Sequence, residues 1–361
     1  MKNWMIGVVG SLAAVTIIGC GGGGSVVGGG VVTPTNVAYG TPTQFLDTQN
    51  LSTGNLTAFN AVGHAVGSDN HGTNFLSSQP VFWTSPTVAT AMAAPDKGTN
   101  VVLSGVNRND EIVGEIDYRS AAKSDAVYYA SPSAAQIVLK TVSNVTYTMA
   151  TSINDKGQIV GKAFGTGTSY SLFWANKDAT PVVLSQDASS DFIKPVHIDN
   201  FGVIHGVNGA SVSWRWASVG SKPSKMSSPA GQPYVVVNGY SPNGIAAGAY
   251  GNDYSGKYAL AAYWPQGSNK ATALASSTGI TTAFLQSSND SGISAGYYQN
   301  SYGTTSALVS SGTTIVDVQN VTPNLDGWDL AKGVYVDAEG NLIAQGTKNG
   351  QSSFVYLKRT Q

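Results

Sequence analysis

The sequence is poor in cysteine and in charge. Its 361 residues include one cysteine, Cys20, so no disulfide can form within the chain and packing must supply the stability. Charged residues make up 11% of the chain and the formal net charge is −1, whereas globular domains usually carry about 25% charged residues. No basic patch is present, which excludes the electrostatic footprint of a nucleic-acid-binding protein.

The sequence also lacks sustained helical periodicity and any apolar run long enough to cross a membrane. The apolar segment Met5–Ile18 follows Lys2 and is typical of a signal peptide. The next residues, Ile17-Ile18-Gly19-Cys20, resemble a bacterial lipobox, in which the cysteine becomes the acylated N-terminus. We therefore expect a lipoprotein signal peptide over residues 1–19 and lipidation of Cys20 in the cell envelope. Gly21 stands where inner-membrane lipoproteins carry Asp, which favours the outer membrane.

Glycine dominates the residues that follow the lipobox. Residues 20–35 begin with Cys20 and continue with a stretch that is almost all glycine up to Gly30. Such a segment cannot bury a core, so we expect a flexible tether between the lipid and the folded part. Residues 36–361 are expected to fold as a single domain.

What this domain has in abundance is a short repeated unit, whose clearest copy is SINDKGQIVGKAFGTGTSYSLFW at residues 152–174. Two apolar runs, Ala150–Asn154 and Ile159–Phe164, flank an Asn-Asp-Lys-Gly turn. Gly157 supplies the positive φ that this type of hairpin turn requires. Two further strands, Ser171–Trp174 and Pro181–Leu184, complete four antiparallel strands in about 40 residues.

The unit occurs seven times at regular intervals. The hairpins end at residues 67, 114, 161, 206, 248, 296 and 344, so successive copies are 42 to 48 residues apart. The third strands recur in phase, most with aromatic residues, as in Val81-Phe82-Trp83 and Leu172-Phe173-Trp174. This period is typical of a repeat architecture in which one unit cannot bury its faces alone.

At these residues the chain resembles the HAF-type extracellular repeat proteins. Their unit runs roughly Ile-Asn-x-x-Gly-x-Val-Val-Gly, a loop, then Ala-Phe-Leu-Trp, and the resemblance covers about residues 51 to 357. It implies an all-β fold, a β-propeller, and the seven copies predict seven blades of about four antiparallel strands. It implies little about activity, because the family is defined by its repeat.

The two ends of the domain predict how the ring closes. The seventh copy ends with its third strand, Phe354–Leu357, and has no fourth strand after it. An extra extended segment, Asn36–Leu46, precedes the first copy. We expect this segment to supply the missing strand and close the ring, since closure removes exposed sheet edges.

The candidate binding surface lies in the loops between second and third strands, which vary in length and are rich in tyrosine. A tyrosine offers an apolar ring and a hydroxyl at low entropic cost, and positive side chains add hydrogen bonds to hydroxyls or carboxylates. The predicted ligand-binding residues are Tyr118, Arg119, Tyr254, Lys257 and Tyr302.

Signals of catalysis and of metal binding are weak. Asp110, Glu111, Glu115 and Asp117 cluster in the second copy and are candidates for the acid/base pair of a carbohydrate-active enzyme. Three of the four histidines, His64, His197 and His205, fall inside repeat strands or turns, where packing is the expected role, and no spacing matches a zinc site. No metal and no cofactor are expected.

Three functions therefore remain open. The favoured one is a non-catalytic binding module, a lipid-anchored envelope propeller that takes a glycan or protein ligand. The alternatives are a carbohydrate-active hydrolase or lyase acting on the loop face, and a structural scaffold. In each case we expect a monomer that contacts the membrane only through its lipid and does not bind nucleic acid.

Overall fold

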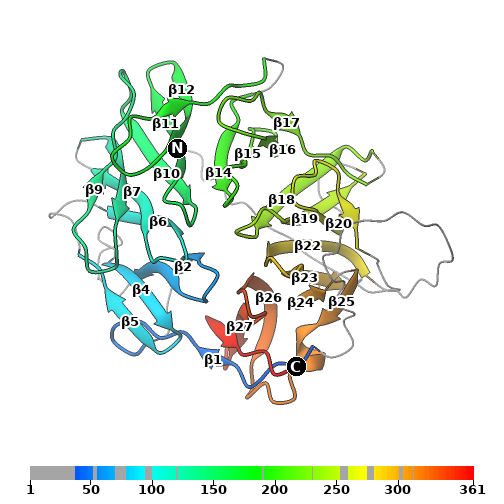
Figure 1. Cartoon of the computed structure of the whole chain (residues 1–361). Coiled ribbons are helices and arrows are strands. Elements are labelled where there is room, and N and C mark those ends of the chain that lie inside the picture. Colours follow the sequence, from blue (N-terminus) through cyan, green and yellow to red (C-terminus); the bar gives the residue numbers. More distant parts are fainter. Residues whose placement is uncertain are drawn as a thin grey trace.

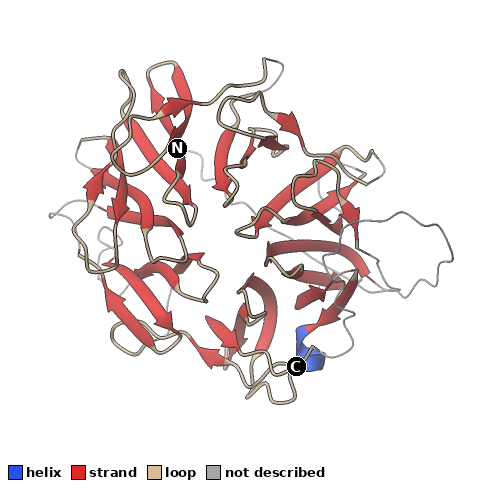
Figure 2. Ribbon diagram, viewed as in Figure 1, coloured by secondary structure: helices blue, strands red, loops and turns tan. Residues whose placement is uncertain are grey.

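The computed structural model describes residues 37–51, 55–69, 79–93, 100–118, 121–188, 191–229, 231–252, 259–274, 280–300, 304–311 and 313–361. The predicted signal peptide, Cys20 and the glycine-rich tether lie outside the described residues. Within these ranges the secondary structure is β-strand, apart from one short 3-10 helix, η1 (Val318–Val321) (Figure 2). Among the described residues, no helix has the length and apolar character needed to span a membrane.

The strands follow the order of the repeat. They are β1 (Thr43–Gln44), β2 (Asn55–Phe59), β3 (Ala65–Asp69), β4 (Gln79–Ser85), β5 (Val88–Ala91), β6 (Asn100–Val106), β7 (Ile112–Tyr118), β8 (Lys123–Tyr129), β9 (Ile137–Val138), β10 (Tyr147–Ile153), β11 (Ile159–Gly165), β12 (Thr168–Trp174), β13 (Val182–Val183), β14 (Lys194–Ile198), β15 (Ile204–Val207), β16 (Ser213–Trp216), β17 (Ser224–Lys225), β18 (Tyr234–Tyr240), β19 (Ala246–Gly251), β20 (Leu260–Trp264), β21 (Thr272–Ala273), β22 (Ile280–Ser288), β23 (Ile293–Asn300), β24 (Thr305–Ser311), β25 (Thr314–Asp317), β26 (Asp329–Val336), β27 (Leu342–Lys348) and β28 (Gln351–Leu357).

The sheets stand around a common axis, as expected of a β-propeller (Figure 1). Five of them are separate four-stranded sheets: β2-β3-β4-β5, β14-β15-β16-β17, β18-β19-β20-β21, β22-β23-β24-β25 and β1-β28-β27-β26. The remaining strands, β6 to β13, form one eight-stranded sheet. The chain is therefore an all-β propeller.

The expectation of seven separate blades was wrong in one respect. The second and third copies share the eight-stranded sheet because β10 pairs in parallel with β8, through Tyr147 and Ser124. Within each copy the pairing is antiparallel, as predicted, for example between β10 and β11 and between β11 and β12. A single parallel residue pair thus merges two units that the repeat pattern predicts as separate.

The sheet of the last copy takes its outer strand from the N-terminal part of the chain. Strand β1 pairs antiparallel with β28, with Thr43 opposite Tyr356 and Gln44 opposite Val355. Tyr39 forms a further bridge to Arg359. This is the pairing that the sequence predicts for the segment Asn36–Leu46, since an outer strand is missing after β28.

The hairpin turn of the repeat forms as the Asn and Gly residues predict. In the third copy the Gly157 N–H donates to the Asn154 oxygen over 3.0 Å, and Gly157 has a φ of +74°. The Oδ1 atom of Asn154 accepts from the N–H groups of Lys156 and Gln158. An Asn side chain followed three residues later by Gly therefore closes the turn between β10 and β11.

A buried tryptophan of the third strand joins neighbouring units. Trp174 and Trp216 are fully buried, and each indole N–H donates over 2.7 Å to a backbone oxygen that follows the outer strand of the preceding unit, on Lys140 and Ser185 respectively. Trp264 makes the equivalent bond to Ser227. The indole keeps its polar atom satisfied while its rings fill the space between units.

The same contact links the first copy to the N-terminal strand. The indole N–H of Trp83 donates over 2.6 Å to the backbone oxygen of Leu46, just beyond β1. Phe45 is fully buried in one apolar cluster with Trp83 and Ile343. Phe45 and Leu46 of the N-terminal part therefore contact Trp83 of the first copy.

Candidate functional site

The turn that follows each first strand begins with a polar residue that caps the turn. In the first copy Oδ1 of Asn60 accepts from the N–H groups of Val62 and His64, at 3.2 and 3.0 Å. Asn107 and Asn289 cap their turns in the same way. All three asparagines are buried. Burial is tolerated here because each amide oxygen is satisfied by its own turn.

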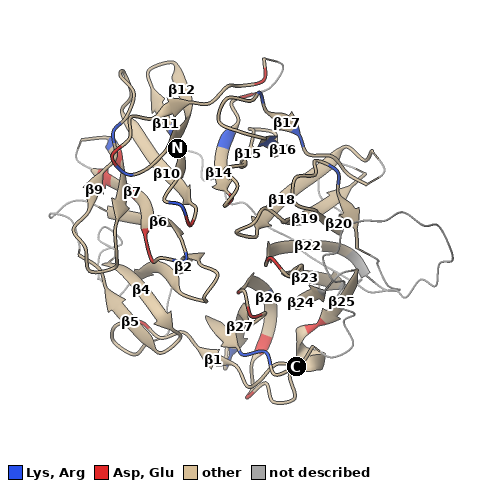
Figure 3. Cartoon of the chain, in the orientation of Figure 1, with Lys and Arg blue, Asp and Glu red and all other residues tan. Residues whose placement is uncertain are grey.

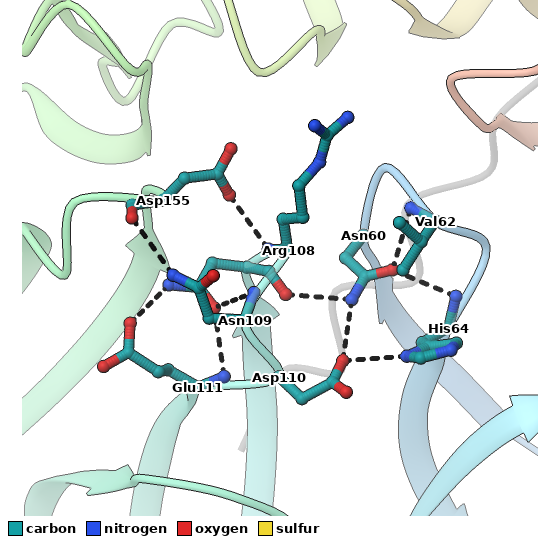
Figure 4. Close-up of polar contacts among 9 residues, drawn as sticks. Asn60, Val62, His64, Arg108, Asn109, Asp110, Glu111 and Asp155 are labelled. Atoms are coloured by element: carbon teal, nitrogen blue, oxygen red, sulfur yellow. Dashed lines mark hydrogen bonds and ion pairs between the residues drawn. The ribbon is translucent and has the colours of Figure 1, made fainter.

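These asparagines also link each turn to the next copy of the repeat. Figure 4 shows Nδ2 of Asn60 directed at the turn of the second copy. Nδ2 of Asn60 donates to the Asn107 oxygen over 2.8 Å, and Nδ2 of Asn107 donates to the Asn154 oxygen over 2.9 Å. Asn154 continues the series to Asp199, and Asn289 makes the equivalent bond to Asp337, both over 2.8 Å. Sequence reasoning identified these residues as turn formers only.

Where the first turn residue is Asp and has no side-chain N–H to donate, a backbone hydrogen bond links the turn to the next copy. At the Asp199 turn the Asn200 N–H donates to the Pro242 oxygen over 2.7 Å. At the Asp337 turn the Ala338 N–H donates to the Ala61 oxygen over 2.9 Å. The second of these bonds joins the last copy of the repeat to the first.

A pocket of about 180 Å³ opens where the first strands end in these turns. The inner ends of β2, β6, β10, β14, β18 and β26 line it, together with turn residues of five copies. Its lining includes Arg108, Asp155, His197, Tyr240 and Tyr335. Aromatic rings form much of the wall, since Tyr335 stacks on Phe59 with ring centres 5.0 Å apart.

Both oxygens of the Asp155 carboxylate, which lines the pocket, accept hydrogen bonds from the protein. Oδ1 of Asp155 accepts from the Arg108 N–H over 2.9 Å, and Oδ2 accepts from Nδ2 of Asn200 over 2.7 Å. The Arg108 guanidinium, in contrast, has no hydrogen bond or ion pair with any residue that the structure describes, and it is exposed (Figure 4). The pocket therefore presents an unpaired positive group beside a carboxylate that is bound to its own walls.

The tyrosine hydroxyls of the pocket are the other available polar groups. Within the described part of the chain, neither Tyr240 nor Tyr335 makes a hydrogen bond through its hydroxyl. Burial raises the pKa of both hydroxyls, and the neighbouring Asp337, Asp290 and Asp155 raise that of Tyr335 further. Both tyrosines therefore keep their protons at physiological pH and can donate.

Two histidines pack beside the pocket on β14 and β15. His197 stacks on Tyr240 with ring centres 4.7 Å apart, and His205 lies 4.5 Å from the same ring. Burial lowers the pKa of His197 to about 4. Burial, followed by the charges of His197 and Arg215, lowers the pKa of His205 well below its usual value. Both rings are therefore neutral at pH 7, and packing is their role, as the sequence predicts.

Of the residues predicted to bind a ligand, the structure describes Tyr118, and Tyr118 does not line this pocket. Tyr118 lies at the end of β7, where Lys123 stands over its ring at 5.4 Å and where it packs against the apolar cluster of the second copy. Arg119, Tyr254, Lys257 and Tyr302 lie outside the described residues. Among the five residues predicted for the loop surface, Tyr118 is therefore the one whose position is described.

The candidate acid/base cluster of the second copy does not converge. Asp110 lies 2.8 Å from Nδ1 of His64, and Glu111 accepts from Nδ2 of Asn107 and from the Tyr128 hydroxyl. Glu115 lies further along β7, where burial raises its pKa. Among the described residues, no group of three or more His, Cys, Asp or Glu side chains is placed to hold a metal ion.

One position of the repeat could have indicated the pocket from the sequence. Two positions before the first turn residue, five copies carry Ala, Gly or Ser, as in Ala58, Gly105 and Ser152. The other two carry large aromatic side chains, His197 and Tyr335. This position lines the pocket in five copies, at Ala58, Gly105, Ser152, His197 and Tyr335, so it is the repeat position that faces the site.

Comparison with known proteins supports the fold. No protein-family profile and no curated protein sequence matches this chain, so the resemblance to HAF-type repeats stays a resemblance. A solved structure, "YCF48 bound to D1 peptide", is similar with a TM-score of 0.52 and 10% identity, over 92% of this chain and 98% of that one.

Two hydrolases also contain a similar fold. A prolyl endopeptidase matches with a TM-score of 0.55 and 9% identity, over 90% of this chain and 50% of that one. A puromycin hydrolase matches with a TM-score of 0.53 and 12% identity, over 90% of this chain and 57% of that one. The chain thus spans 50% of one hydrolase and 57% of the other. At such identities these likenesses define the class of fold alone, which is the β-propeller.

Proposed function

We propose that this chain is a non-catalytic binding propeller that holds a peptide segment of another protein in its central pocket. The observation that carries this proposal is the set of unpartnered hydrogen-bond donors in the pocket, on Arg108, Tyr240 and Tyr335. A concave site with a few convergent polar groups on an aromatic wall is the usual form of a binding site. The first strands β18 and β26 position Tyr240 and Tyr335, and the turn after β6 positions Arg108.

A peptide ligand is supported by the apolar rim of the pocket. Phe201 is 63% exposed and follows Asn200, which lines the pocket, while Val62 is 49% exposed on the turn of the first copy. Exposed apolar side chains beside a pocket suit a protein partner better than a sugar. Among proteins of similar fold, YCF48 has been solved with a D1 peptide bound.

The enzymatic alternative finds little support in this pocket. A glycosidase needs two carboxylates on either side of the scissile bond. The pocket lining contains one, Asp155, and both of its oxygens accept hydrogen bonds from the wall. The scaffold alternative would predict a channel filled by side chains, whereas this channel retains an open volume of about 180 Å³.

The proposal includes a closed seven-bladed ring of the HAF type. Counting the eight-stranded sheet as two joined blades gives seven units, one for each copy of the repeat. Closure is supported by the β1–β28 pairing, by the bond from Trp83 to Leu46, and by the bond from Ala338 to Ala61. Strand β1 would then act as the fourth strand of the seventh blade.

The proposal also places the propeller at the outer membrane, attached as a monomer by a lipid on Cys20. The support is the lipobox Ile17-Ile18-Gly19-Cys20 and the glycine-rich stretch after it. Tyr118, Arg119, Tyr254, Lys257 and Tyr302 remain the proposed residues of a second contact surface on the loops.

A parallel screen tests the function. The purified protein is applied to an array of peptides tiled from envelope proteins and to a glycan array, and each ligand found is measured by calorimetry. We expect a peptide ligand whose affinity falls with Arg108→Gln and not with Tyr118→Ala. Loss with Tyr118→Ala alone would move the site to the loops. A glycan ligand that is cleaved during the assay would establish the enzyme instead.

A further inference from the structure

We infer that the central pocket receives a carboxylate of the bound peptide, from a Glu or Asp side chain, held by Arg108 and by the hydroxyls of Tyr240 and Tyr335. This inference rests on the proposed function and names the group that the pocket recognises. It depends on which polar atoms of the pocket the fold uses and which it leaves available.

The fold uses the side-chain oxygens of the turn residues around the pocket, while Nε2 of His197 is buried without a hydrogen bond in the described part of the chain. The Oδ1 atoms of Asn60, Asn107 and Asn154 each accept two N–H groups of their own turns. Oδ1 of Asn200 accepts from the Asp155 N–H over 2.9 Å. With both oxygens of Asp155 engaged as well, the pocket offers a ligand few side-chain oxygens that lack a hydrogen bond.

The fold leaves donors available. The backbone N–H of Arg108 donates to the Asp155 side chain. The Arg108 guanidinium makes no hydrogen bond or ion pair with the residues that the structure describes. Tyr240 is held by stacking on His197, and Tyr335 by stacking on Phe59. Rigid walls thus present three donor groups, and an acceptor with a negative charge is their complement.

The surrounding charges restrict the ligand to one negative group. Asp155, Asp290 and Asp337 all act electrostatically on the Tyr335 hydroxyl, together with Arg108. Oδ1 of Asp290 accepts from the Asn243 N–H over 2.8 Å. These three carboxylates repel any negative group, so a carboxylate of the ligand must pair directly with Arg108, and further negative charge on the ligand would weaken binding. An otherwise neutral or basic peptide with one acidic side chain fits this field.

Nuclear magnetic resonance with blocked peptides tests the inference. The probes are two acetylated and amidated tetrapeptides, Gly-Glu-Phe-Gly and Gly-Gln-Phe-Gly, and methyl glucuronide as a sugar that carries the same group. We expect the Glu peptide to shift the Arg108 side-chain Nε–Hε signal and the backbone amide signals of Arg108 and Asp155. The Gln peptide should bind at least tenfold more weakly.

Matched variants separate the pocket from the general charge of the molecule. Arg108→Gln should abolish the preference for Glu over Gln. Lys156→Gln removes the same charge one residue after Asp155, from a side chain outside the lining, and should retain the preference. Tyr335→Phe and Tyr240→Phe should each weaken Glu-peptide binding several-fold while leaving the unfolding temperature close to that of the native protein.

The outcomes separate this inference from the proposed function. Equal binding of both peptides at the pocket would overturn the carboxylate while leaving a peptide-binding propeller. Tighter binding of the glucuronide than of the Glu peptide would keep the carboxylate and replace the peptide by an acidic sugar. Absence of any shift at Arg108 with all three probes would overturn the inference, while the array screen would still decide the proposed function.

Discussion

Nδ2 of Asn154 donates a hydrogen bond to the backbone oxygen of Asp199, 2.8 Å away in the next copy of the repeat. The same side chain caps its own turn through Oδ1. One amide therefore closes a local hairpin and ties it to its neighbour. The repeat spacing of the sequence brings the two turns together, because each copy places its first turn residue at the end of its first strand.

Replacing this asparagine should destabilise the protein. Asn154→Ala removes the turn cap and one of the two hydrogen bonds that the Asp199 oxygen accepts, the other coming from the Gly202 N–H over 3.0 Å, so it should cost about 1–3 kcal/mol. Asn154→Asp keeps the cap, but a carboxylate oxygen replaces the Nδ2 group that donates to the Asp199 oxygen and to Oε1 of Gln158, so it should cost at least as much. Urea unfolding measures both. Asn176→Ala, at an exposed turn, is the control and should change stability by less than about 1 kcal/mol.

Gly157 should not tolerate a side chain that resists its backbone conformation. Its φ is +74°, and a Cβ at this position would meet only the Glu111 carboxylate at ordinary contact distances. Gly157→Val should therefore cost about 1–3 kcal/mol through backbone strain and not through collision. The comparison is Gly220→Ala, which has open space and no positive φ. Equal unfolding midpoints for the two variants would show that the turn is not under this constraint.

The N-terminal strand should contribute to the stability of the whole ring. Phe45 is fully buried, and its N–H donates to the Phe354 oxygen over 2.9 Å. Phe45→Ala should cost about 3–5 kcal/mol, as large-to-small core substitutions do. Leu51→Ala, at a residue that is 50% exposed, should change stability by less than about 0.5 kcal/mol. Thermal unfolding by calorimetry measures both, and an unchanged Phe45→Ala protein would contradict the closure proposed here.

Acid should destabilise the protein through its two buried histidines. The pKa of His197 is lowered to about 4 and that of His205 well below its usual value. The unfolded chain binds protons near pH 6.5, so the stabilisation is complete above that pH and is lost as the pH falls towards 4. The loss should be on the order of 3 kcal/mol for a shift like that of His197.

A variant isolates this effect from other titrating groups. Burial raises the pKa of Glu115, Asp199 and Asp337, which acts in the opposite direction at acidic pH. His205→Phe keeps an aromatic ring beside Tyr240 and removes one titrating group. Its unfolding midpoint should fall less between pH 7 and pH 5 than that of the native protein. Parallel curves for the two proteins would count against the buried, neutral His205.

Cys20 should carry a lipid in the bacterial envelope. The expectation comes from the lipobox that ends at this residue. Metabolic labelling with a fatty-acid analogue should mark the native protein and leave Cys20→Ser unmarked. The variant should also leave the membrane fraction. Labelling of both proteins to the same extent would place the lipid elsewhere.

The sequence by itself determined the repeat, the hairpin turns and the need for an outer strand. Each of these depends on local chemistry: Asn154 and Gly157 define a turn within four residues, and the missing strand after Leu357 follows from counting strands in each copy. The N-terminal segment was the available extended stretch, and Thr43 and Gln44 do pair with β28.

Only the tertiary structure decided where the pocket lies and which polar atoms remain available in it. His197, Tyr240 and Tyr335 come from the fourth, fifth and seventh copies, and they line one pocket because the first strands converge on one axis. The merging of the second and third units likewise depends on one contact between strands, Tyr147 with Ser124. Hydrogen-bond satisfaction is a property of the assembled ring. The sequence does not show whether the Arg108 and Asp155 side chains are hydrogen-bonded. In the folded protein both carboxylate oxygens of Asp155 accept hydrogen bonds, whereas the Arg108 guanidinium makes none with the described residues. Figure 3 shows that Lys, Arg, Asp and Glu residues lie on turns, loops and strands around the propeller.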